Sequence, residues 1–149
     1  NRICEYRSEK PIFTIDFQND AKFVNGCIAG GRNYLHINAN GDIEPCAFIH
    51  YSDSNIREKT LLEAYQSPLF MAYHNNQPFN DNMLRPCPML ENPECLRSMV
   101  KKSGAHSTEY QSPESVDHLC DKTTLYAETW KPKADELWAA CQGCSGCKK

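Results

Sequence analysis

The chain has 149 residues, of which 40% are hydrophobic and 23% are charged, and its formal net charge is −3. A chain of this length can bury about 68–70% of its unfolded surface, which is enough for one hydrophobic core. The weakly acidic balance provides no basic field for nucleic acid. No apolar run approaches the roughly 18 residues of a membrane span, and no signal peptide is visible. We therefore expect a cytoplasmic domain without a nucleic-acid or membrane partner.

The first 24 residues contain one predicted strand, at 11–17, in which consecutive side chains alternate between two faces. A single strand buries little surface, so we interpret it as the last strand of a sheet that is formed upstream. The chain begins at Asn1 rather than Met, which indicates a processed protein or a fragment.

Between Cys27 and Cys46 the pattern predicts a two-stranded hairpin that turns at Asn40-Gly41. Leu35 and Ile37 alternate with polar neighbours before the turn, and an isoleucine at 43 continues their apolar face. If 33–37 pairs with 43–46, Cys46 lies beside residues 31–33, a few residues from Cys27. The hairpin therefore predicts half of a metal or cluster site.

Two short helices are predicted after the hairpin. Thr60 and Glu63 have capping-box spacing, and the helix that they open should end before Ser67. Ser67 then caps a second helix that has Pro68 at its first position. The apolar residues expected in the core of these helices and of the next one are Leu61, Leu62, Phe70, Leu96, Met99 and Val100.

Cys87 lies between two prolines that favour an extended backbone. Asn92 is expected to cap a third helix that ends at Gly104. Beyond 105 the chain is more polar, and short helices are predicted to begin near 112 and near 132. The chain ends in a cluster of cysteines at 141, 144 and 147.

The sequence contains nine cysteines among 149 residues, about 6%, which is below the roughly 8–10% that is typical of a disulfide scaffold. Their odd number would leave one thiol unpaired if the others formed disulfides. Reduced, metal-binding cysteines fit this pattern better than disulfides. Cys27 and Cys46 supply two thiolates from the base of the hairpin, and Cys87 is the natural third. Cys95 lies near the third position of a predicted helix, where the N–H groups and the helix dipole lower a thiol's pKa. Cys95 is therefore a possible fourth ligand.

Thirteen residues separate Cys27 from Gly41, four more separate Gly41 from Cys46, and Cys87 follows at a distance. This spacing resembles the auxiliary-cluster module of radical S-adenosylmethionine (SAM) enzymes, the SPASM and twitch domains. The match covers about residues 11–105. The wider motifs that carry it are 30–38, 41–50, 67–70 and 85–88. The resemblance implies that Cys27, Cys46 and Cys87 bind an auxiliary [4Fe–4S] cluster, and that 11–17 is the last strand of a catalytic barrel.

Two departures from the family pattern limit this interpretation. The dense Cys-x2-Cys-x5-Cys-x3-Cys run of full SPASM domains is missing, so we expect one cluster, as in the twitch type. The Cys-x3-Cys-x2-Cys motif of the SAM-cleaving cluster is also missing, so this chain alone should not generate a radical. We expect the C-terminal part of a radical SAM oxidoreductase or maturase, partnered by an upstream barrel that binds SAM and by a peptide or small-molecule substrate.

Several alternatives remain open. Cys27, Cys46, Cys87 and Cys95 could instead form a structural zinc site in a non-enzymatic interaction domain. A cluster with four cysteine ligands would relay electrons, whereas one with three would leave an iron free to orient substrate. His50, which follows Cys46 closely, could reach the edge of the cluster. The C-terminal Cys-x2-Cys-x2-Cys lacks the fourth cysteine of a ferredoxin run, and we expect it to be a frayed tail with free thiols.

The predicted fold is α+β, with a small β-hairpin and a flanking strand packed by short helices around a cysteine metal or cluster site. We divide the chain into the end of an upstream barrel at 1–24, an auxiliary iron–sulfur domain at 25–105 and a helical tail at 106–149.

Overall fold

The computed structural model describes residues 5–6, 9–11 and 20–142, with side chains only as far as 140. The predicted strand at 11–17 lies almost wholly outside the described residues, as do Cys4, Cys144 and Cys147. Within the described part the chain forms five helices and two antiparallel two-stranded sheets, so the predicted α+β class is confirmed. None of the described helices combines the length and apolar character that crossing a bilayer requires.

The predicted hairpin is present, with β1 (His36–Ile37) paired antiparallel to β2 (Ile43–Glu44). The side-chain oxygen of Asn38 accepts the backbone N–H of Asn40 at 2.9 Å, which starts the turn. Gly41 follows with a φ of +91°, a conformation that favours glycine. The Asn-Gly signal therefore identified the turn correctly from local chemistry.

Both faces of this hairpin carry buried side chains: Ile43 on the predicted apolar face is completely buried with Leu35 packed beside it, and the opposite face holds a buried carboxylate. The Glu44 side chain is completely buried, and one of its oxygens lies 2.7 Å from His36 Nδ1. Its other oxygen accepts hydrogen bonds from Thr108 Oγ1 at 2.5 Å and from Asn38 Nδ2 at 3.2 Å. By contrast Ile37, predicted to share an apolar face with Leu35 and Ile43, is 38% exposed. The hairpin is thus fixed in place by a buried polar network.

Helices α3 (Leu61–Tyr65) and α4 (Pro68–Asn75) begin where the sequence predicts. Thr60 and Glu63 form a complete capping box, since each side chain accepts the other residue's backbone N–H. The Ser67 hydroxyl accepts a hydrogen bond at the start of α4. The prediction that Leu61 and Leu62 lie in the core is wrong, because they are 53% and 70% exposed. A helix of about one turn buries only one side, and here that side carries Ala64.

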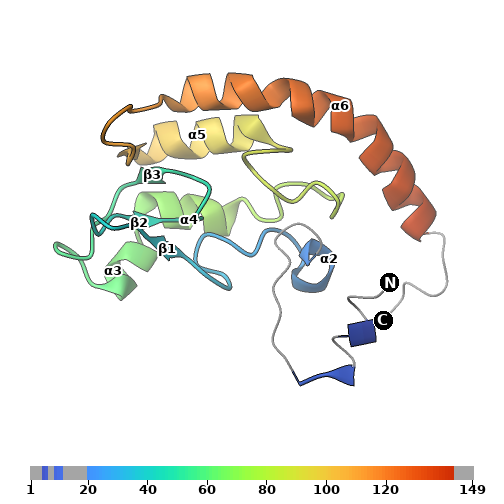
Figure 1. The fold of residues 1–149 in the computed structure, drawn as a ribbon, viewed down its shortest axis with the longest axis horizontal. Helices are drawn as coiled ribbons and strands as arrows, with labels where there is room; N and C mark the ends of the chain where they lie inside the picture. The colour runs from blue at the N-terminus through green and yellow to red at the C-terminus, as the bar shows by residue number, and fades with distance from the viewer. Residues whose placement is uncertain (1–4, 7–8, 12–19, 143–149) are drawn as a thin grey trace.

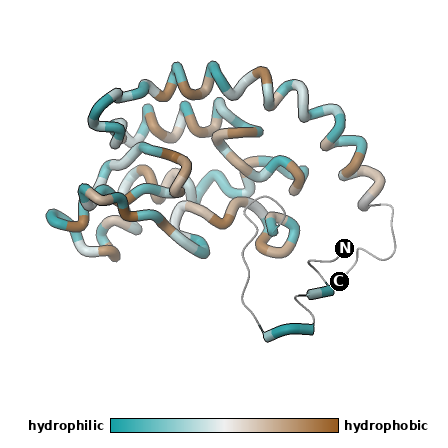
Figure 2. The backbone as a smooth tube through the Cα atoms, in the orientation of Figure 1, coloured by the Kyte–Doolittle hydropathy of each residue, from teal (hydrophilic) through white to brown (hydrophobic). Residues whose placement is uncertain are grey.

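Helices α5 (Pro93–Ser103) and α6 (Val116–Gln142) lie side by side, with α4 on the other face of α5 (Figure 1). Apolar residues recur at intervals along α5 (Figure 2), and the buried ones include Leu96, Met99 and Val100, as predicted. A short sheet pairs β3 (Tyr51–Ser52) with β4 (His106–Ser107). A four-residue helix, α2 (Ala21–Val24), precedes Cys27. The boundaries proposed at 24 and 105 stay predictions.

The two short helices predicted after residue 105 are wrong, because the chain forms a single helix of 27 residues with Pro132 inside it. Contacts with the loop at 82–85 hold the helix on both sides of this proline. The Trp130 indole N–H donates to the Leu84 carbonyl at 3.1 Å. The Asp135 carboxylate accepts from Asn82 Nδ2 at 2.9 Å. These tertiary contacts override the local preference of proline to end a helix.

Candidate functional site

The hairpin brings Cys46 back to the segment that carries Cys27. The backbone N–H of Gly30 donates to the Pro45 carbonyl at 2.9 Å, which joins the residues just after Cys27 to the residue just before Cys46. On the same hairpin, the Tyr34 hydroxyl donates to Cys46 Sγ at 2.6 Å. The predicted proximity of the two cysteine segments is therefore confirmed.

Gly30 permits a close approach between this segment and helix α4. Its φ is +67°, and a Cβ atom at this position would lie 2.6 Å from the Tyr73 side chain. Since real Cβ atoms do not approach carbon so closely, only glycine lets the backbone lie against the tyrosine ring. The fully buried Tyr73 thereby sets the position of the Cys27 segment.

The loop that carries Cys87 is held by its own backbone. The Cys87 N–H donates to Glu91 Oε2 at 2.8 Å. The Cys87 carbonyl accepts backbone N–H groups from Glu91 and Asn92 and the Asn92 side-chain amide, each at 3.1 Å. Asn92 occupies the N-cap position of α5 as predicted, but its side chain does not cap the helix. Its amide instead fastens the cysteine loop, since it also donates to the Arg85 carbonyl at 2.8 Å.

Cys27, Cys46 and Cys87 line one cavity of about 200 Å³. They come from three separate segments of the chain: the residues after α2, the end of the hairpin and the loop before α5. Most of the remaining wall is apolar, and Ile49 and Leu90 contribute to it. The structure thus places three thiols along one largely apolar cavity.

Burial controls the chemistry of these thiols. It raises the pKa of Cys27 to about 11 and that of Cys87 to about 12. Backbone N–H groups oppose this effect: that of Ala29 lies 3.5 Å from Cys27 Sγ, and those of Leu90 and Met89 lower the pKa of Cys87. Metal ligation requires thiolates, so binding of a cationic group at these cysteines would release their protons to solvent. N–H groups directed at sulfur are the contacts that stabilise thiolate ligands and tune an iron–sulfur cluster.

Cysteine thiols, N–H groups directed at sulfur and an apolar wall are the chemical groups that an iron–sulfur cluster uses, so the residues present fit such a cluster in kind. Within the described residues, no three His, Cys, Asp or Glu side chains lie close enough together to hold a single metal ion. The ligand set of Cys27, Cys46, Cys87 and Cys95 stays a prediction.

Cys95 packs against the same core cluster as Cys27 but is not among the residues that line the cavity. It is half-buried in the first turn of α5 and does not line the cavity. Burial, followed by the charge of the neighbouring Glu94, raises its pKa, and the other cysteines do not contribute to that shift. Cys120, which the sequence left without a role, is fully buried, and its Sγ donates to the Pro93 carbonyl at 3.2 Å.

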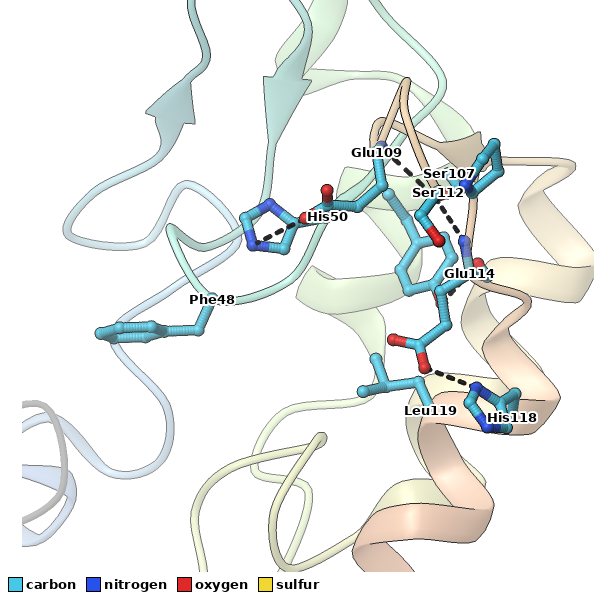
Figure 3. A pocket seen from close by; sticks show the side chains of 10 residues that line it. Phe48, His50, Ser107, Glu109, Ser112, Glu114, His118 and Leu119 are labelled. Carbon is cyan, nitrogen blue, oxygen red and sulfur yellow. Dashed lines mark hydrogen bonds and ion pairs between the residues drawn. The ribbon is translucent and has the colours of Figure 1, made fainter.

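A second cavity, of about 450 Å³, lies between the β3–β4 sheet and the start of α6 (Figure 3). His50 lines it, with Nε2 3.7 Å from Glu109, and His118 Nδ1 lies 2.6 Å from Glu114. Phe48 lines both cavities, although Figure 3 shows its ring directed away from His50. Sequence reasoning considered only His50 here, because the other residues are joined to it by the β3–β4 pairing and carry no local signal.

Comparison with known proteins identifies one family in this region. Residues 27–99 match the model of the SPASM family, described as an iron–sulfur cluster-binding domain. The match includes all three cysteines of the cavity as well as Cys95, and it ends before Cys120. No curated protein and no solved structure gave a significant match to the chain.

Proposed function

Because residues 27–99 match the family model of SPASM iron–sulfur cluster-binding domains, we propose that they hold one auxiliary [4Fe–4S] cluster in a radical SAM enzyme. The observation that supports the proposal is the cavity into which three distant segments bring Cys27, Cys46 and Cys87. Iron–sulfur clusters are bound through cysteine thiolates, and the matched segment supplies three of them at one place.

Each part of the cavity has a role in this proposal. The thiolates of Cys27, Cys46 and Cys87 would ligate iron, and the N–H of Ala29 and the hydroxyl of Tyr34 would each donate to one of these sulfurs. The apolar wall would keep water from the site. When bound, such a cluster supplies one-electron transfer or an iron that can coordinate substrate.

The position of Cys95 favours the second of these two roles. Because Cys95 does not line the cavity, we propose that three cysteines ligate the cluster and that one iron is left open to orient a peptide or small-molecule substrate. The SAM-binding barrel, its radical chemistry and an oxidoreductase or maturase activity would belong to an upstream part of the same protein.

Anaerobic reconstitution with iron and sulfide tests this function. We expect about four irons and four sulfides per chain, with absorbance near 400 nm. Replacing Cys27, Cys46 or Cys87 by alanine should abolish or strongly reduce the bound iron. Cys95→Ala is the matched control, since it removes a cysteine of the same domain that lies outside the cavity, and it should retain the cluster.

Two results would contradict the proposal. One zinc per chain that iron and sulfide cannot displace would favour the zinc-stabilised interaction domain instead. If Cys95→Ala stays folded but loses the cluster, Cys95 would be a fourth cysteine ligand. That result would favour the electron-relay role over an open iron.

A further inference from the structure

The hydroxyl of Tyr73 is a buried polar group with no hydrogen-bond partner among the residues that the structure describes. The side chain comes from the middle of α4 and has no solvent exposure. Its oxygen makes no hydrogen bond within the described part of the chain. An unsatisfied buried hydroxyl destabilises a protein, and such groups are rare in native structures. This one therefore requires an explanation.

The ring itself is fixed on two sides. It packs edge-on against Phe79, with ring centroids 5.5 Å apart and an interplanar angle of 86°. The backbone of Gly30 lies against it, so closely that a Cβ there would be 2.6 Å from the ring. The hydroxyl consequently cannot swing away to find a partner without disturbing a packed core.

Tyr73 does not itself line the cavity, but it belongs to the same buried core cluster as Ala29, Cys46 and Ile49, which do. After burial, the groups that raise the pKa of Tyr73 are Cys27, Cys87 and Cys46, in that order, followed by Tyr34. The effect of these thiols on the pKa agrees with the place of Tyr73 in the core beside the cavity. Among the described residues no protein group accepts the hydroxyl proton, whereas the sulfurs of a bound cluster could.

Two other tyrosines show what is unusual about this one. Tyr34 already donates to Cys46 Sγ at 2.6 Å. Tyr51 is similarly buried, yet its hydroxyl donates to the Glu114 carbonyl at 3.0 Å. Among these three hydroxyl groups, that of Tyr73 alone has no acceptor.

We propose that the Tyr73 hydroxyl donates a hydrogen bond to a sulfur of the cluster held by Cys27, Cys46 and Cys87, and so raises the reduction potential of that cluster. The inference rests on the proposed function, since it requires a cluster in the cavity. A donor to a cluster sulfur stabilises the reduced form, which carries the additional negative charge. Tyr73 is a positioning and tuning residue here and takes no part in proton or group transfer.

The test compares Tyr73→Phe with Tyr51→Phe in metal-free and reconstituted protein. In the metal-free state Tyr73→Phe should keep or raise the urea midpoint, because it removes an unsatisfied hydroxyl and leaves the ring in place. Tyr51→Phe should lower that midpoint, because it breaks an existing hydrogen bond. In the reconstituted state Tyr73→Phe should shift the midpoint potential to a more negative value and the Fe–S stretching frequencies upward. Tyr51→Phe should change neither.

The outcomes separate the two proposals. If the wild-type chain takes up no iron–sulfur cluster, the proposed function fails and the Tyr73 inference fails with it. If the wild type is loaded and Tyr73→Phe has the same potential and Fe–S frequencies, only the inference is overturned. A clearly lower urea midpoint for metal-free Tyr73→Phe would also overturn it, because the hydroxyl would then have a partner within the chain. Loss of iron from a folded Tyr73→Phe, with Tyr51→Phe fully loaded, would support it.

Discussion

Gly30→Ala tests whether the close approach between the Cys27 segment and Tyr73 is a real constraint. Two costs combine at this position. The residue has a φ of +67°, and a side chain in the left-handed region costs about 1–2 kcal/mol. The new Cβ would lie 2.6 Å from the Tyr73 side chain, and displacing a packed ring costs about 1–3 kcal/mol more. We therefore expect the free energy of unfolding to fall by about 2–5 kcal/mol.

Gly104→Ala supplies the matched control. Gly104 ends α5 with a φ of +70°, almost the same as that of Gly30, but a Cβ atom added there would have nothing within 4 Å. Only the backbone cost of about 1–2 kcal/mol applies at this position. The entropy that alanine removes from the unfolded chain is common to both variants and cancels in the comparison.

Urea unfolding of the metal-free, reduced protein measures both variants. With a slope of about 2 kcal/mol per M, Gly30→Ala should lower the urea midpoint by about 1–2.5 M, and Gly104→Ala by less than about 1 M. Equal midpoints for the two variants would show that the chain accommodates a side chain beside Tyr73. In that case the positioning of the Cys27 segment by α4 would be refuted.

Three further predictions concern the framework of the site. Thr60→Ala removes the capping box formed with Glu63 and should cost about 1 kcal/mol in urea unfolding, with no change expected in cluster loading. Leu96→Ala opens a cavity at a completely buried position and should cost about 2–5 kcal/mol, whereas the exposed Lys102→Ala should cost almost nothing. Burial raises the pKa of Asp42, but hydrogen bonds from neighbouring amide and phenol groups outweigh this and lower it below 3.8. The ionised Asp42 carboxylate therefore stabilises the folded protein fully above the pKa of the unfolded state, and this stabilisation is lost as the pH falls through the lower pKa of the folded state. Asp42→Asn should consequently make the free energy of unfolding depend less on pH on the acid side. Parallel profiles for wild type and variant would contradict that account.

Where the sequence predicted structure well, the signal was local. The turn between β1 and β2 follows from Asn38 and Gly41, because a short side chain and a positive φ fold the backbone within a few residues. The starts of α3 and α4 follow from Thr60 and Ser67, whose oxygens satisfy N–H groups that every helix leaves free. Such signals act over three or four residues and are therefore readable in the chain itself.

Where the predictions failed, the cause was packing between distant segments. Pro132 should end a helix by local chemistry, but contacts on both sides of it keep α6 continuous. Leu61 and Leu62 are apolar, yet the one-turn helix that carries them buries only its Ala64 side. No pattern within a segment states which of its faces will meet another segment.

The cysteine site shows the same division. The sequence by itself indicated that the segments of Cys27 and Cys46 lie side by side, because an Asn-Gly turn and a short hairpin return the chain locally, and the cysteine spacing pointed to the family whose model residues 27–99 match. Only the tertiary structure decided that Cys87 joins them and that Cys95 does not line the same cavity. It also decided that the hydroxyl of Tyr73 is buried with no hydrogen-bond partner among the described residues. The physical reason is that these positions depend on how α4, α5 and the loop at 76–92 pack together, which is settled by the whole core.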